Sequence, residues 1–517
     1  MTHPSRRQFM AMTGGTAALM GLGLSPAALA QAAASGQLTM AYSSDVPTWD
    51  PNARTLAAVQ SLYKCLFDQP LDQSPALETI PALITEWGYQ DDDGLELALS
   101  FRDDVLFHDG VPMTAEDFRF TFFERPRMEV PDGQRRPDTA FLWRNVEDIE
   151  VISPTEAVMK FTQPFPSAIS WLHFLASFVV PKHVFEDVGL EGFQARPIGT
   201  GPYRFVEYQP GSRVVMEAFA DYWNGAPAIP NLTVEFVRDA TARVAAIEAR
   251  RVQVSVDLPI RENERLAAMP GLTGRVDPVA DVILLQITQN GGFERPEVRL
   301  AAHHAINKEA LSRAFYLGRA VPIAAPAARG TPGYPEDFDF PFSEERALEL
   351  LASVGHGPDN PVRVTLSTTN GFFPNDFDLS RAIAGMWERV GIQAEVEVIE
   401  ASTYQERLRA QELMEATIFQ WGNSTGDPEM YGGYLLDPNA IFSAMKAPEM
   451  GELIGPLLTE TDHEARMAGY RHAHQFAVEN GFAIGLLQAT KSVVHTDDVA
   501  YAAWDNGWTL PAAWSLG

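Results

Sequence analysis

The feature of this sequence that most constrains its fold is the alternation of strand and helix patterns in its second half. Residues 362–367 and 394–398 have the pattern of strands, and residues 379–390 and 403–411, which follow them, have the pattern of helices. Strand–helix alternation of this kind builds an α/β layer with parallel strands. The sequence therefore predicts an α/β fold for this half of the chain.

The first half has a more mixed pattern, in which strands recur as hairpins. Two pairs of predicted strands are each joined by a short turn that contains proline: 146–152 with 156–161, and 203–208 with 213–218. Thr114 and Asp117 together come close to a capping box, which marks the start of a helix. Further predicted strands cover 38–42, 95–101 and 232–237, and further predicted helices cover 55–67, 240–250 and 296–316.

The length of the chain requires more than one hydrophobic core. It has 517 residues, whereas a single core stops growing at about 250–300 residues. The mixed first half and the regular second half indicate two α/β lobes. A cleft between two such lobes is a usual place for a small ligand.

The first thirty residues have the pattern of an export signal. Arg6 and Arg7 precede an apolar run of small residues over 11–24, and an A-x-A sequence follows at 28–30. The paired arginines point to the twin-arginine route. The apolar run is too short and too rich in glycine and alanine for a membrane span, which needs about 20 strongly apolar residues. We therefore expect cleavage after Ala30 and a mature protein that is free in the periplasm.

The charge and the single cysteine exclude several classes of function. The chain carries 39 basic and 68 acidic side chains, a formal net charge of −29, and such a surface repels the phosphate backbone of nucleic acids. Cys65 is the single cysteine, so the chain cannot form an internal disulfide, a cysteine-based zinc site or an iron–sulfur cluster. We expect Cys65 to be a small buried hydrophobic residue.

Motifs of catalysis and of metal binding are missing from the sequence. The His303-His304 pair and the pair His472 and His474 do not have the i,i+4 spacing of a zinc pair on a helix. No G-x-S-x-G elbow occurs, and residues 199–202 (GTGP) lack the Gly-Lys-Ser/Thr end of a phosphate loop. The twin-arginine signal is common in redox enzymes, but nothing indicates a cofactor. The sequence therefore predicts a protein that is not an enzyme and binds no cofactor and no metal.

Five segments, in order along the chain, resemble the peptide/nickel/opine-type periplasmic binding proteins of ABC importers, solute-binding protein family 5. The most specific is 101–118 (FRDDVLFHDGVPMTAEDF). The others are 197–205 (PIGTGPYRF), 221–225 (DYWNG), 297–299 with 305–311 (EVR and AINKEAL), and 391–398 (GIQAEVEV).

This resemblance implies a two-lobed periplasmic-binding-protein fold of type II, of the large cluster with an extra subdomain in lobe one. Lobe one would comprise residues 31–275, with the extra subdomain at about 55–190, and the return of the chain at 489–517. Lobe two would comprise residues 276–488. Two strands would join the lobes, a small solute would be enclosed between them, and membrane permease subunits would receive it from a monomeric protein. Gly199 and Gly201 are expected to supply unusual backbone angles.

The resemblance also locates the ligand. Residues 419–428 (FQWGNSTGDP) correspond to the family stretch W-x-x-D-x-x-D-P, whose first aspartate pairs with the α-ammonium of the ligand in peptide-binding members. Here that position is Ser424, while Asp427 remains and is expected to be a turn residue. A buried ammonium without its carboxylate loses about 3–5 kcal/mol, or roughly two to four powers of ten in affinity. We therefore expect a ligand that is not an ordinary peptide held by its amino terminus.

Oligosaccharides, glycosides, opines and modified peptides fit a neutral hydroxyl better, and an ordinary peptide is the alternative. Asp45 or Glu429 could substitute for the missing aspartate. Trp421 could stack on the ligand or lie in the core, and Asn423 and Ser424 offer hydrogen bonds.

Two loops and one arginine complete the set of candidate ligand-binding residues. The first loop follows the first strand of lobe one, and the second follows a lobe-two strand, where ligands of α/β proteins usually bind. Arg329 could contact an anion, although a surface salt bridge is the simpler interpretation. The loop residues are Tyr42, Ser43, Ser44 and Asp45, and then Asn370, Phe372 and Phe373, whose two aromatic rings are expected to be exposed.

The expected mechanism is closure of the two lobes over the ligand, with contacts from both lobes favouring the closed form. Two other functions compete with solute binding. One is a secreted hydrolase or redox enzyme, which would show turnover or a bound cofactor. The other is a sensor or chaperone role on the same fold.

Overall fold

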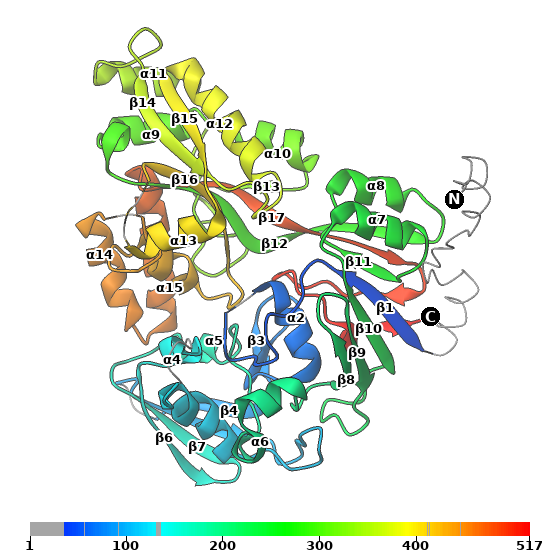
Figure 1. Ribbon diagram of the computed structural model, residues 1–517. Coiled ribbons are helices and arrows are strands. Elements are labelled where there is room, and N and C mark those ends of the chain that lie inside the picture. Colours follow the sequence, from blue (N-terminus) through cyan, green and yellow to red (C-terminus); the bar gives the residue numbers. More distant parts are fainter. Residues whose placement is uncertain are drawn as a thin grey trace, which may run out of the picture.

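The computed structural model describes residues 36–517 apart from 56, 91–92, 131–135, 411, 413 and 445. The expected leader at 1–30 lies outside the described residues. The described chain forms an α/β fold of two lobes with an additional subdomain below lobe one (Figure 1). Within the described residues no helix combines the length and the apolar character that crossing a membrane would need.

One sheet of 11 strands runs through both lobes, in the order β15-β14-β16-β12-β17-β11-β1-β10-β9-β8, with β13 also paired to β17. Its strands are β1 (Gln37–Tyr42), β8 (Tyr203–Gln209), β9 (Arg213–Ala218), β10 (Asn231–Phe236), β11 (Val254–Val256), β12 (Leu272–Ile287), β13 (Val321–Pro322), β14 (Val362–Thr368), β15 (Ile392–Val398), β16 (Ala416–Gly422) and β17 (Ala483–Thr496).

The long strands β12 and β17 connect the two lobes. In lobe one, 272–278 of β12 pairs antiparallel with 490–496 of β17. In lobe two, 282–286 pairs with 483–488, and the register shifts between Pro278 and Val282. An irregularity of this kind bends a strand pair and increases its twist. The sheet therefore changes direction where it passes from one lobe to the other (Figure 1).

Lobe one packs helices on both faces of its part of the sheet. Helix α2 lies over a core that includes Leu38, Met40 and Val254, and helices α7 and α8 cover the other face, where Ala41 and Val494 are buried. The chain ends in lobe one with the short pair β18 and β19. These elements are α2 (Ala57–Leu66), α6 (Lys182–Ala195), α7 (Ala240–Glu248), α8 (Ile260–Ala267), β18 (Val499–Ala500), a helical turn (Pro511–Ala513) and β19 (Ser515–Leu516).

The additional subdomain is built on an antiparallel sheet in the order β4-β5-β7-β6. Its core is rich in aromatic rings, among them Phe118, Phe122 and Trp143. The predicted capping box is present, because Asp117 accepts hydrogen bonds from the backbone N–H and the hydroxyl of Thr114. The elements are β2 (Leu71–Gln73), β3 (Thr79–Pro81), β4 (Ile84–Tyr89), β5 (Glu96–Phe101), α3 (Ala115–Arg119), helical turns (Phe120–Glu124 and Arg125–Arg127), α4 (Thr139–Leu142), β6 (Val146–Ser153), β7 (Glu156–Phe161) and α5 (Ala168–Trp171).

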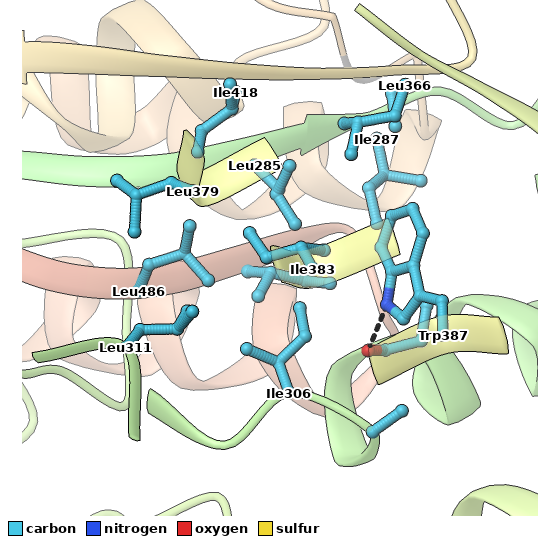
Figure 2. Close-up of a cluster of buried hydrophobic side chains, with 14 of the residues drawn as sticks. Leu285, Ile287, Ile306, Leu311, Leu366, Leu379, Ile383, Trp387, Ile418 and Leu486 are labelled. Carbon is cyan, nitrogen blue, oxygen red and sulfur yellow. Dashed lines mark hydrogen bonds between the residues drawn. The ribbon is translucent and has the colours of Figure 1, made fainter. Parts of the chain in front are cut away.

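Lobe two also has helices on both faces of its sheet, because alternate residues of β12 enter different cores. Ile283 and Leu285 face the cluster under α9, α10, α11 and α12, whereas Val282 and Leu284 face α13, α14 and α15. Figure 2 shows the first cluster, in which Trp387 donates its indole N–H to the Ala302 carbonyl at 2.8 Å. The helices are α9 (Pro296–His304), α10 (Lys308–Tyr316), α11 (Glu344–Ser353), α12 (Asp376–Val390), α13 (Ala401–Ala410), α14 (Pro448–Ile454) and α15 (His463–Glu479), with helical turns at Gly291–Phe293, Pro428–Met430, Gly432–Leu436 and Gly455–Leu458.

Most predicted elements are confirmed within two or three residues, and two predictions about them were wrong. The helix predicted over 296–316 is two helices, because the side chain of Asn307 accepts the Ala310 N–H and starts α10 anew. The lobe-two sheet is parallel only where β14 pairs with β15 and β16, since β12 lies antiparallel to β16.

The prediction of unusual backbone angles at Gly199 and Gly201 was also wrong, because neither residue is among those with positive φ. They are required for close approach instead. A Cβ at Gly199 would lie 2.1 Å from the Leu66 carbonyl oxygen, and a Cβ at Gly201 would lie 2.5 Å from the Leu66 carbonyl carbon. The backbone at these glycines therefore packs directly against the end of α2.

Candidate functional site

Polar side chains gather where β12 and β17 pass between the lobes. From lobe one, Ser43 follows β1 and Asp257 follows β11, two parallel neighbours in the sheet. From lobe two, the end of β16 supplies Gln420 and leads into the loop 423–427. The connecting strands add Asp281 and Lys491. We refer to this region as the lobe junction.

The lobe-one side of the junction is an ion pair with a hydroxyl partner. The Lys491 ammonium lies 2.6 Å from Asp257 Oδ1, and the Ser43 hydroxyl donates to Asp257 Oδ2 at 2.6 Å. Burial by itself would raise the pKa of Asp257, but the Lys491 charge and these hydrogen bonds outweigh burial, so the pKa is lowered. Burial also disfavours the charged form of Lys491, but the negative charge of Asp257 favours it more strongly. The pKa of Lys491 is therefore raised. Both groups therefore stay charged.

The backbone at Asp257 is held in an uncommon conformation. Its φ is 56°, in the left-handed region that aspartate tolerates better than most residues. The buried Arg243 donates to the carbonyl oxygens of Val256 at 3.0 Å and of Asp257 at 2.7 Å. Arg243 thereby fixes the turn that presents the Asp257 carboxylate to Ser43 and Lys491.

The lobe-two side of the junction is built around Asp281. Gln420 donates its side-chain N–H to Asp281 Oδ2 at 2.8 Å. Oδ1 accepts no hydrogen bond from any described residue, and a Cβ at Gly422 would lie 2.7 Å from it. Burial raises the pKa of Asp281, against the Gln420 hydrogen bond and the charge of Lys491. The Asp281 carboxylate is therefore only partly satisfied by the protein.

Trp421 contacts both parts of the molecule. Its indole N–H donates to the Met430 carbonyl at 2.6 Å, and its ring centre lies 5.4 Å from that of Phe442. The half-buried ring packs against the core of the subdomain as well as that of lobe two. Trp421 is therefore partly a packing residue, and the rest of its side chain is exposed to solvent.

The loop after Trp421 is stabilised from within. Asn423 is fully buried, and its side chain donates to the Asp427 carbonyl at 3.0 Å and accepts from the backbone and the hydroxyl of Thr425. The amide of Asn423 is thus used by the loop. Ser424 is 8% exposed, and its hydroxyl forms no hydrogen bond with a described residue. A Cβ at Gly426 would lie 3.1 Å from the Leu77 carbonyl oxygen, so the loop rests on lobe one.

Asp427 is more than a turn residue. Arg466 of α15 binds it through two nitrogens, at 2.8 and 2.7 Å, and also lies 3.2 Å from Glu429. The Ser170 hydroxyl, in the subdomain, donates to Asp427 at 3.3 Å. Burial and the charge of Asp427 raise the pKa of Glu429 to about 7. Glu429 is therefore engaged in this cluster and is not a free acid.

Asp45 is also engaged, on the lobe-one side. Its carboxylate accepts hydrogen bonds from the Tyr208 hydroxyl at 3.1 Å and from the Gly211 N–H at 2.6 Å. Ser44 is half-buried, and Tyr42 is buried in the lobe-one core beside Lys491, with its hydroxyl pKa raised by burial. Ser43 is thus the residue of this loop that the structure joins to the junction through a hydrogen bond.

The second predicted loop does not have two exposed rings. Phe372 is 53% exposed, but Phe373 is buried in the lobe-two core. The carboxylate of Asp376 binds the backbone N–H groups of Gly371 and Phe372, and Asn370 is exposed. Among described residues, this loop forms its hydrogen bonds within lobe two. Arg329 is exposed and lies over the Tyr334 ring at 5.9 Å, apart from the junction contacts.

Four residues of the junction were not predicted from the sequence: Asp257, Asp281, Gln420 and Lys491. A usable signal existed for two of them. Lys491 is the single Lys, Arg, Asp or Glu within 483–496, and Asp281 is the single one within 279–287, both otherwise apolar or neutral strands. A lone charge in a buried strand needs a partner, and such charges are often functional.

The described residues offer few other sites. An open hollow of about 420 Å³ lies in lobe one, and its lining includes Trp49, Phe205 and Tyr208 but no residue of the junction. Among the described residues, no group of three or more histidine, cysteine, aspartate or glutamate side chains could hold a metal ion. Cys65 is buried, which raises the pKa of its thiol to about 12.

Comparison with known proteins places the chain among transport proteins. The family model described as "Bacterial extracellular solute-binding proteins, family 5 Middle" matches residues 78–443. The chain is 25% identical to heme-binding protein A of Haemophilus influenzae over 426 residues, with 77% of each chain covered. It is 26% identical to the glutathione-binding protein GsiB of Salmonella typhi over 428 residues, with 80% of each covered.

The fold also matches solved structures. One is a dipeptide-binding protein from Pseudoalteromonas sp. SM9913 in complex with Met-Leu, at a TM-score of 0.78 and 19% identity. The match covers 93% of this chain and 100% of that one. At this identity the likeness supports the two-lobed fold and says nothing about the ligand.

Proposed function

The chain belongs to the bacterial extracellular solute-binding proteins of family 5, and we propose that it captures a small solute at the lobe junction and delivers it to membrane permease subunits of an ABC importer. The observation that carries this proposal is the convergence of polar groups from both lobes on the two connecting strands. Ser43 and Asp257 come from lobe one, and Asp281 and Gln420 come from the lobe-two end. No catalytic step is part of the proposal.

Closure of the lobes would use the irregular part of the connecting strands. The register of β12 and β17 shifts between Pro278 and Val282, opposite 488–490. These positions lie close to the boundaries that we predicted at 275/276 and 488/489. We take them as the hinge, because a short irregular segment can change its backbone angles while the sheets on either side stay intact.

The ligand that we propose is not an ordinary peptide held by its ammonium at position 424. Ser424 presents a neutral hydroxyl there, and the nearby acids Asp427 and Glu429 are already bound by Arg466. A modified peptide or an opine fits this arrangement. Oligosaccharides and glycosides would also suit the hydroxyl. An ordinary peptide is the alternative, which the names of the glutathione-binding relative and of the Met-Leu complex favour.

Ligand binding to the purified mature protein, residues 31–517, tests this function. Ligand at 100 times its Kd stabilises a binding protein by about 2.7 kcal/mol, so a thermal-shift panel of peptides, opines and oligosaccharides should reveal binders. The bound protein should have a smaller radius of gyration in X-ray scattering, and the ligand should be recovered unchanged. Chemical conversion of the bound ligand would contradict the proposal.

Export and solution state are part of the same proposal. We infer that the leader at 1–30 directs the chain to the periplasm and is cleaved near Ala30, and that the mature protein is a monomer. N-terminal sequencing of protein recovered from the periplasm, and its mass in solution, check both inferences.

A further inference from the structure

We propose that Asp281, together with Gln420, binds a positively charged group of the ligand, an ammonium or a guanidinium. This inference rests on the proposed function and adds to it the chemical class of the solute. Three observations support it: the hydrogen-bond partners of the Asp281 carboxylate, the partners of the neighbouring carboxylates, and the charge at the junction.

The protein satisfies only one side of the Asp281 carboxylate. Gln420 donates to Oδ2 at 2.8 Å, and Oδ1 has no donor among the described residues. The amide orientation of Gln420 is fixed by this contact, because a carboxylate can only accept. Its Oε1 therefore points elsewhere and has no described donor of its own. Two acceptor oxygens, Asp281 Oδ1 and Gln420 Oε1, remain for the several N–H donors of a cation.

The space beside Oδ1 of Asp281 exists because residue 422 is a glycine, which has no side chain to fill it. Gly422, which faces Asp281 across the β12–β16 pair, would place a Cβ 2.7 Å from Oδ1 if it carried a side chain. The position is dense enough for burial to raise the pKa of Asp281, yet the residue is only half-buried. Oδ1 is not among the fully buried side-chain atoms, so it still reaches solvent and a small ligand group can replace water beside it.

Three other carboxylates near the junction have cations of the protein as partners, whereas Asp45 and Asp505 form no ion pair with a described residue. Asp257 has Lys491 at 2.6 Å, Asp277 has Arg275 at 2.9 Å, and Asp427 has Arg466 at 2.7 Å. Lys491 lowers the pKa of Asp281 through its charge, but its ammonium is bound to Asp257. A half-buried carboxylate whose partner is a neutral amide lowers the stability of the protein unless a positive group also binds it.

The charge balance around Asp281 also favours a cation. Asp277 and Arg275 cancel each other, and the remaining acids Asp257, Asp281 and Asp505 meet two bases, Lys491 and Arg243, which leaves an excess of one negative charge. The Ala280 N–H donates to the Asp505 carbonyl at 2.6 Å, which places residue 505 directly beside this strand. An opine or an amine-bearing peptide derivative fits this field, whereas a neutral sugar gains nothing from it.

Matched pairs of probes test the proposal on the mature protein. The charged probes are the tripeptide Ala-Leu-Ala, putrescine and octopine. N-acetyl-Ala-Leu-Ala, diacetylputrescine and maltotriose are the uncharged or amine-blocked counterparts. At least one charged probe should bind, and its counterpart should bind at least tenfold more weakly. Asp281→Asn should weaken the charged probe about 10- to 100-fold, because it removes a charge-assisted hydrogen bond.

Asp277→Asn is the matched control, since it removes an equal charge from the same strand next to Arg275, and it should change the affinity less than threefold. In the ligand-free protein, Asp281→Asn should leave Tm unchanged or raise it, because no protein cation loses its partner. A clear fall in Tm would show that Asp281 is a structural anchor and would overturn the proposal.

The outcomes separate this inference from the proposed function. If maltotriose or an acetylated probe binds as well as the amine, or if Asp281→Asn leaves amine binding intact, the cation site is refuted while solute binding stands. If no member of either set binds, the solute-binding function is contradicted together with the cation site.

Discussion

Gly199 and Gly201 show how single residues fix the packing of lobe one. Both lie against the last turn of α2, so their role is spatial and does not depend on an unusual backbone angle. Gly201 also donates its N–H to the Leu66 carbonyl at 3.0 Å, which ties the two segments together.

Substitution of Gly199 by alanine should therefore destabilise the protein. The added Cβ would lie 2.1 Å from a backbone oxygen, which cannot move aside as a side chain does. We expect a loss of about 1–3 kcal/mol in the free energy of unfolding, measured by urea denaturation. Gly385→Ala in α12, where a Cβ would meet nothing within 4 Å, should be neutral or slightly stabilising. Equal effects of the two substitutions would contradict this account.

Glu429 should make stability depend on pH. Burial and the Asp427 charge raise its pKa in the folded protein to about 7, from an ordinary value of 4.5. Between these values the folded state binds more protons than the unfolded state, so this group's contribution to stability falls as pH rises from about 4.5 to 7. Glu429→Gln should flatten this dependence between pH 5 and pH 8 in urea unfolding, and exposed Glu452→Gln should not. A steeper dependence in Glu429→Gln would contradict the assigned direction.

Among the elements, helix α15 and the loop 423–427 are coupled through one ion cluster. Arg466, in the first turn of α15, binds Asp427, the last residue of the loop, and Glu429, which lies two residues beyond it. All three side chains are at most 11% exposed, so the charges depend on one another rather than on water. This cluster sets the position of the loop that carries Ser424.

Arg466→Met should destabilise the protein by about 3–5 kcal/mol, because it leaves two buried carboxylates without a cation. Urea unfolding measures the effect. Asp427→Asn with Glu429→Gln, added to Arg466→Met, should recover most of the loss, since no buried charge then remains. Failure of the triple variant to recover would show that the hydrogen-bond geometry matters more than the charge.

At the scale of the whole molecule, the two lobes touch beside the junction. The Trp171 ring of the subdomain lies 6.0 Å from that of Tyr434 in lobe two, and Leu77 of lobe one lies against Gly426. A Cβ at Gly426 would lie 3.4 Å from the Leu77 Cβ, close to the separation of about 3.5–4.5 Å in disulfides.

The double variant Leu77→Cys/Gly426→Cys should therefore form a disulfide that restrains lobe movement. We expect slower binding and release of any probe that the wild type binds, with the wild-type rates restored by reduction, in stopped-flow fluorescence. Cys65 should not interfere, because it is buried and burial raises its pKa to about 12. Leu77→Cys alone is the control. Unchanged rates in the oxidised variant would show that lobe movement does not limit exchange.

Local patterns were enough to predict most elements, because they rest on neighbours in the chain. The two hairpins of the first half, the capping box at Thr114 and the strands of lobe two were confirmed. The break within 296–316 was missed because apolar residues continue across it, and the Asn307 cap was not recognised.

The sequence by itself determined the α/β class, the two lobes, the family and the stretch that carries Ser424. Each of these depends on short sequence segments or on the order in which the segments follow one another. Only the tertiary structure decided which charges are satisfied. Asp281 and Asp257 look alike in the sequence, because each is a single acid in or beside an apolar strand. In the structure, Lys491, which is more than 200 residues further along the chain, neutralises Asp257. Among the described residues, Asp281 has only the side-chain amide of Gln420 as its partner. Ion pairs form between residues that are neighbours across the sheet but distant in the sequence, so no local sequence pattern predicts them.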